Sequence, residues 1–94
     1  MHVVAVEIEL HLPGVHSLKE KRSRLKPLLA RLQSHFNAAC AETDLQNQHQ
    51  RAIITCVTVS TTGAHAEQMA RRIPPWIERN RPDLDVIDEA YTHL

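Results

Sequence analysis

The stretch HVVAVEIELHLPGVHSLKE, residues 2–20, contains the signals that decide the fold of this chain. Its first part, residues 2–12, alternates apolar with more polar residues, and the apolar set is Val4, Val6, Ile8, Leu10 and Leu12. A period of two predicts a β-strand with one buried face. Pro13 and Gly14 then predict a type II turn, because proline fixes the φ of its second position and glycine accepts the positive φ of the third.

A helix is predicted from Ser17, because Ser17 and Glu20 form a capping box that satisfies free backbone amides at a helix start. An apolar stripe at helical spacing follows, with Leu28 at its edge and Leu18, Leu25, Leu29, Leu32 and Phe36 along its length. Pro27 removes one backbone hydrogen bond, so we expect a kink there.

The remainder of the chain predicts four further elements. Residues 37–44 form a weak strand, and residues 50–61 are rich in β-branched side chains, which is typical of a central strand. A second helix is expected over 65–80, broken near Pro74–Pro75, and a last strand over 84–94. The order β-α-β-β-α-β predicts a single α+β domain, residues 1–94, with the ferredoxin-like two-layer sandwich in which two helices cover one face of an antiparallel sheet.

The composition limits the classes of function. Within 94 residues, eleven Lys and Arg balance eleven Asp and Glu, which excludes a strongly basic nucleic-acid clamp and an acidic tail protein. The only aromatic residues are Phe36, Trp76 and Tyr91. No signal peptide and no apolar run of membrane-spanning length is apparent, so we expect a cytoplasmic protein.

Two motifs carry a resemblance to a known family. VEIELHLPG (residues 6–14) and HSLKEKR (16–22) resemble the start of the YlxP-like family of bacterial proteins, and AETD (41–44) and QRA (50–52) fit its later part. The resemblance implies a ferredoxin-like fold and no established activity. It also implies a link to translation, because members are often encoded beside genes for initiation factor two and a ribosome-binding factor.

The predicted first helix is strongly basic, although the chain is neutral. Its candidate nucleic-acid-binding residues are Lys19, Lys21, Arg22, Arg24, Lys26 and Arg31. Such a helix can contact phosphates without recognising base sequence. Base stacking on the central strands is excluded, because residues 2–12 and 50–61 contain no aromatic residue. The alternative is that these side chains form an ordinary solvated helix face.

A candidate polar site is formed by Glu9, His11, His16 and His65. No HExxH or CxxC spacing makes them converge on a metal, so hydrogen bonds of His11 and His16 around the Pro13–Gly14 turn are the simpler expectation. No arrangement of nucleophile and base and no glycine-rich phosphate loop is present, so we expect no catalytic residues, no cofactor and no small-molecule substrate.

Two smaller expectations concern the predicted hairpin. Cys40 and Cys56 are expected to be small buried thiols on neighbouring strands, and Asp44 is expected to pair with Arg51. The core face of strand 50–61 stays open, because Ile53, Val57 and Val59 on one side compete with Ile54 and Cys56 on the other.

The sheet face without helices supplies the second hypothesis about function. Val3 and Ala5 point to that face, and an exposed apolar sheet favours a partner, here a second copy of the chain. We therefore expect a non-enzymatic accessory factor that contacts ribosomal RNA or a ribosomal subunit through the basic helix. The alternative is a homodimeric protein–protein interaction module without a nucleic-acid role.

Overall fold

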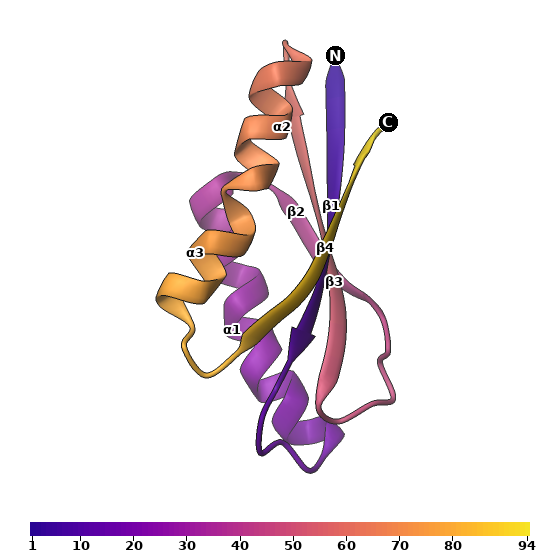
Figure 1. The fold of residues 1–94 in the computed structure, drawn as a ribbon, viewed down its shortest axis with the longest axis vertical. Helices are drawn as coiled ribbons and strands as arrows, with labels where there is room; N and C mark the ends of the chain where they lie inside the picture. Colours follow the sequence, from indigo (N-terminus) through magenta and orange to yellow (C-terminus); the bar gives the residue numbers. More distant parts are fainter.

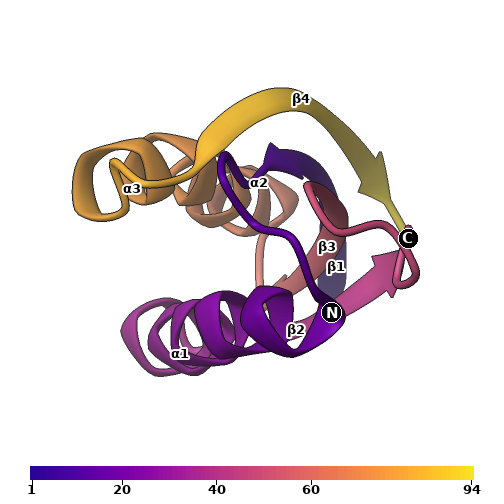
Figure 2. The ribbon, with the colours of Figure 1, turned by 90° about the horizontal axis from the view of Figure 1, so that it is seen from below.

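The computed structural model describes all residues, 1–94. The elements are β1 (His2–His11), α1 (Leu18–Phe36), β2 (Ala39–Asp44), β3 (Arg51–Ser60), α2 (Gly63–Arg71), α3 (Ile73–Asn80) and β4 (Asp85–His93). The four strands form one antiparallel sheet in the order β2-β3-β1-β4. The helices lie together on one side of it, as Figures 1 and 2 show. The predicted ferredoxin-like α+β fold is confirmed.

The helix α1 begins as its capping box predicts. The Ser17 hydroxyl accepts a hydrogen bond from the Glu20 amide at 3.1 Å, and the Glu20 carboxylate accepts one from the His16 amide at 3.3 Å. The helix continues through Pro27 and ends at Asn37, which adopts the left-handed conformation with φ 51°. The shorter β2 begins two residues later.

The buried stripe of α1 differs from the predicted one. Lys21, Leu25, Leu28 and Leu32 are buried, at the three- and four-residue spacing of one helix face. Leu28 therefore lies in the centre of the core face rather than at its edge, while Leu29 is only partly buried. The buried stripe is rotated around the helix relative to the predicted one, because it includes Lys21 as one of its buried positions.

The pairing with β1 decides which face of β3 enters the core. Cys56 lies opposite Val6 and Ile54 opposite Ile8, so these β3 side chains share the helix-covered face. Ala52 and Thr58 are buried on the same face. Ile53, Val57 and Val59 therefore point to the open face of the sheet.

The second helix is broken, as predicted, but the break lies at Arg72, before Pro74–Pro75 rather than at them. Pro74 and Pro75 lie in the first turn of α3, where their missing amides have no intrahelical acceptor. Trp76 and Ile77 then bury against the core, so the break redirects the helix without interrupting its apolar face.

Candidate functional site

Unpaired positive charge is concentrated in the helical layer. Six of the eleven Lys and Arg side chains form no ion pair with a carboxylate: Lys19, Arg22, Lys26, Arg31, Arg72 and Arg79. All six are exposed and belong to α1, α3 or the residue between α2 and α3. The strands hold a single Lys or Arg, Arg51, which pairs with Glu9 of β1.

The free cations of α1 lie on two flanks of the helix. Lys19, Arg22 and Lys26, which we call the β2-side patch, follow one another at three- and four-residue spacing and so share a flank. Arg22 and Lys26 line a hollow of about 410 Å³ together with Glu42 of β2. Arg31 lies on the other flank, with its guanidinium carbon 5.0 Å from the ring centre of Trp76.

Lys21 is a correction to the predicted nucleic-acid-binding set. Its side chain is only 1% exposed, and its ammonium lies 2.7 Å from the Glu42 carboxylate oxygen Oε2. It also donates a hydrogen bond to the Leu45 carbonyl oxygen at 2.7 Å. Its place on the buried stripe, four and seven residues before Leu25 and Leu28, is the signal that identifies it as internal. Lys21 holds β2 against α1 and is not accessible to a phosphate.

Arg24 is also engaged within the molecule. Its guanidinium lies 3.5 Å from the Glu20 carboxylate and 3.7 Å from that of Asp83. Asp83 in turn accepts two hydrogen bonds from Arg81, at 3.0 and 2.9 Å, which hold the pKa of Asp83 below its usual range. Arg24 therefore adds less free positive charge to the surface than Arg22 or Lys26.

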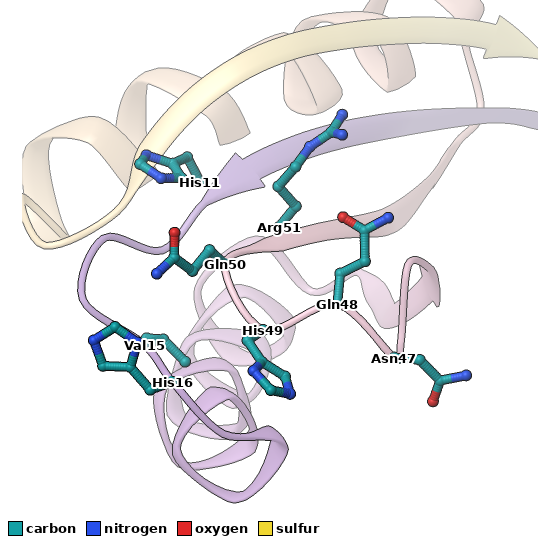
Figure 3. A pocket seen from close by; sticks show the side chains of 8 residues that line it. All are labelled: His11, Val15, His16, Asn47, Gln48, His49, Gln50 and Arg51. Carbon is teal, nitrogen blue, oxygen red and sulfur yellow. The ribbon is translucent and has the colours of Figure 1, made fainter.

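The loop between β2 and β3 forms a polar hollow with the end of β1. Its volume is about 480 Å³, and its lining residues are His11, Val15, His16, Asn47, Gln48, His49, Gln50 and Arg51. Figure 3 shows these side chains spread around the opening, with His11 lying next to the start of β4. His11 Nδ1 is 3.1 Å from an Asp85 carboxylate oxygen. The lining offers hydrogen-bonding groups but only one permanent charge, Arg51, which Glu9 already pairs.

The predicted polar site is brought together only in part: His11 and His16 line the same hollow and Glu9 pairs with Arg51 of its lining, whereas His65 lies elsewhere. His65 Nδ1 lies 2.8 Å from Ser60 Oγ, and the strand register places Ser60 beside His2, at the end of β1 far from His11. The expected hydrogen bond of the His11 side chain around the turn is absent, because its Nδ1 lies against Asp85, and His16 bonds at the helix start through its backbone amide, which donates to Glu20. The predicted Asp44–Arg51 pair is also wrong, because Arg51 pairs with Glu9 instead.

No group of three or more His, Cys, Asp and Glu side chains is placed to hold a metal ion. The two thiols do form a close pair: Cys40 and Cys56 are directly opposed in the β2–β3 register, and both are free. The Cys56 thiol donates a hydrogen bond to Cys40 sulfur, which lowers the pKa of Cys40. The same bond and burial raise the pKa of Cys56.

The open face of the sheet is divided into an acidic and an apolar part. Glu7, Glu9 and Asp88 lie on neighbouring positions of β1 and β4, around a small hollow whose apolar lining residues are Ile53 and Ala90. Towards the other end, Ala5 lies opposite Val57. Phosphates would be repelled from the acidic part, so the helical layer is the surface that can receive an anion.

None of the helices is both long enough and apolar enough to cross a membrane.

The comparisons with known proteins give a family without an assigned activity. Residues 3–91 match the family described as "Protein of unknown function (DUF503)". The chain is also 33% identical over 72 residues to the "Uncharacterized protein YlxP" of Bacillus subtilis (strain 168), a match covering 77% of this chain and 78% of that protein. The family match spans β1 through most of β4, and the chain therefore belongs to the DUF503 family, the YlxP-like proteins.

Proposed function

We propose that the protein is a non-enzymatic accessory factor that contacts RNA, on ribosomal RNA or a ribosomal subunit, through the exposed cations of α1. One observation supports this proposal above the others. Lys19, Arg22 and Lys26 form a row without any acidic partner, in a chain whose total charge is zero. Cations that are not needed inside the molecule are available to neutralise phosphates.

The residues of the sheet indicate how the protein would contact RNA. The central strands β3 and β1 carry no aromatic side chain, so they offer no base-stacking platform. The acidic residues Glu7, Glu9 and Asp88 on the open face oppose an approach of RNA from that side. The α1 surface contacts the backbone and not the bases, so binding depends steeply on salt and weakly on sequence.

The test uses labelled fragments of ribosomal RNA and whole small subunits, with fluorescence anisotropy at two salt concentrations. The double variant Arg22→Gln plus Lys26→Gln should bind more weakly. The slope of log affinity against log salt should become shallower by about 0.7–0.9 for each phosphate that the variant no longer neutralises. Lys21 is unsuitable for this test, because its replacement disturbs the core.

The matched control neutralises an arginine that is already paired. Arg51→Gln removes the same charge as Arg22→Gln but lies on the sheet, next to Glu9. It should leave the affinity nearly unchanged. Equal losses for Arg51→Gln and Arg22→Gln would show that RNA senses only net charge and would contradict a specific role of α1.

A second candidate is a homodimer formed through the apolar part of the open sheet face, acting as a protein–protein interaction module. Val59 is 59% exposed there, although Val3, Ala5 and Val57 beside it are partly buried. Burying this patch would favour association. Light scattering after size exclusion should give twice the 10.7 kDa chain mass, and Val59→Lys should restore the single-chain mass. A single-chain mass at every concentration would eliminate this candidate.

A further inference from the structure

A second basic surface lies where α1 meets α3, and the helix α1 alone does not account for it. Trp76 of α3 packs against His35 at 5.4 Å and Phe36 at 6.0 Å between ring centres. Beside this aromatic cluster is a hollow of about 310 Å³, lined by His35, Phe36, Trp76, Arg71, Arg72 and Arg79 together with Pro75. We call this hollow, together with Arg31 above Trp76, the α1–α3 seam.

The arginines of the seam are largely free of internal partners. Arg72 and Arg79 form no ion pair: Arg72 directly precedes α3, and Arg79 lies seven residues later, in the last turn of that helix. Arg71 has one acidic neighbour, Glu67, at 3.4 Å, and its guanidinium lies over the Tyr91 ring. No carboxylate lines the hollow. The hollow therefore has two guanidinium groups without an ion pair, Arg72 and Arg79, and a third, Arg71, that is already paired, an arrangement suited to an anion.

Phosphate is the anion that this arrangement fits best. A guanidinium is planar and donates two parallel hydrogen bonds to a phosphate, and the aromatic wall formed by Trp76, itself only 7% exposed, strengthens the attraction by excluding water. The buried Trp76 ring leaves no face for a base to stack on, so the seam suits the backbone of a nucleic acid rather than its bases.

The position of the seam relative to the β2-side patch suggests a continuous path. Arg31 brings the seam to one flank of α1, while Lys19, Arg22 and Lys26 occupy the other flank. A helix with its side chains is about 10–12 Å wide, which successive phosphates of one strand can span. We propose that the α1–α3 seam is a second phosphate-binding subsite, and that a single RNA strand crosses α1 from the β2-side patch to Arg72 and Arg79. This inference rests on the proposed function.

Trp76 is the only tryptophan, so its emission reports on the seam alone. The experiment titrates the protein with a fluorescein-labelled oligouridylate of about twelve nucleotides, a typical length for single-strand sites. Anisotropy of the label measures binding anywhere on the protein, and Trp76 emission, recorded with the same oligonucleotide unlabelled, measures occupation of the seam. We expect both signals to change with the same midpoint.

The variant for the seam is Arg72→Gln plus Arg79→Gln, which should keep the fold because both side chains are exposed and unpaired. Its salt slope should become shallower by about 0.7 for each phosphate that it no longer neutralises. Arg79→Gln alone is matched by Arg51→Gln, which removes the same charge from the sheet. Thermal unfolding of each variant verifies the fold.

The outcomes separate the two proposals. One outcome overturns the seam as a phosphate-binding subsite and keeps the proposed function. In that outcome Arg22→Gln plus Lys26→Gln weakens RNA binding, Trp76 emission does not change, and the seam variant binds RNA normally. An anisotropy that never rises overturns both. A Trp76 response to polyglutamate as strong as that to RNA, at equal salt, shows that the seam selects carboxylates and also overturns the phosphate assignment.

Discussion

Lys21 ties together three segments through one ammonium group. It projects from α1, contacts the Glu42 carboxylate of β2 and donates to the carbonyl oxygen of Leu45, where the chain leaves β2 with a positive φ of 59°. The buried Glu42 oxygen Oε2 has no other partner. The interaction therefore fixes both the edge strand and the start of the β2–β3 loop.

We expect Lys21→Met to lower the free energy of unfolding by about 3–5 kcal/mol, because it leaves the Glu42 carboxylate buried without a cation. Urea denaturation measures the change. Lys26→Met, on the exposed side of the same helix, should change stability by less than about 0.5 kcal/mol. Adding Glu42→Leu to Lys21→Met should recover most of the loss. Equal effects at Lys21 and Lys26 would contradict the buried pair.

The two cysteines should differ in reactivity. Cys40 is partly exposed and its thiolate is favoured by the hydrogen bond from Cys56, which is fully buried and keeps its proton. Iodoacetamide should modify Cys40 in the folded protein and leave Cys56 unmodified. Cys56→Ala removes the donor, so the pKa of Cys40 rises and the pH at which alkylation is half-maximal should move upward. Faster alkylation of Cys56 than of Cys40 would be incompatible with this pairing.

At the scale of elements, the loop between α3 and β4 is attached to α1 through Arg81. Its guanidinium donates to the Arg24 carbonyl oxygen at 3.1 Å and to both carboxylate oxygens of Asp83. Leu84 is buried directly after it. The loop thereby sets the point at which β4 enters the sheet beside β1.

Asp83→Asn should lower stability at neutral pH by about 0.2–1 kcal/mol, the range of exposed ion pairs, because the Asp83 side chain is 39% exposed. The pKa of Asp83 is lowered in the folded state, so its contribution is present above the pKa of the unfolded chain. The difference from the parent protein should shrink below about pH 4 and vanish in stronger acid. Glu78→Gln, which removes an exposed carboxylate of α3 that forms no ion pair, should change stability at neutral pH by less than about 0.5 kcal/mol.

The elements that were predictable are those with strong local signals. The alternation in β1 and the Ser17–Glu20 capping box depend only on neighbours in sequence, and both are confirmed. The face of β3 was not predictable, since Ile53 and Ile54 are equally apolar and only pairing with β1 distinguishes them. The predicted stripe of α1 is misplaced because Lys21, polar by type, is buried through its ion pair with Glu42 of the strand β2.

The candidate site was predictable only in part for a similar reason. The residue types of α1 show that it is basic, but the loss of free charge at Arg24 depends on Asp83, which is distant in sequence. Arg72 and Arg79 were missed altogether. The sequence shows only that they flank Pro74–Pro75. Their proximity to Arg31 arises from the packing of α3 against α1, which the sequence does not reveal.

At the scale of the whole molecule, the layers carry opposite charge. The strands contain most of the acidic residues and only Arg51 as a base, whereas α1 and the α2–α3 region contain all the unpaired cations. A chain with pI near 7.1 is therefore strongly polarised between its helical layer and its sheet.

We expect the protein to be retained on immobilised heparin, a polyanion, at a pH close to its pI, where a uniformly charged protein would flow through. Arg22→Gln should elute at lower salt than the parent protein, because the helical layer faces the matrix. Arg51→Gln, with the same change in net charge, should elute almost unchanged. Identical elution of the two variants would contradict a polarised surface.

The place of β1 in the sheet also has a consequence for synthesis. Among these elements β1 is translated first, and it pairs along most of its length with β4, which is translated last. Its buried residues are Val4, Val6, Ile8 and Leu10. The strand β1 can pair with β3 once β3 has been synthesised, but it lacks its other neighbour, β4, until the last element has been synthesised. Pairing of such distant segments is slow compared with local helix formation. The nascent chain therefore exposes an edge of its central strand throughout elongation, and the sheet closes only once β4 has left the ribosome.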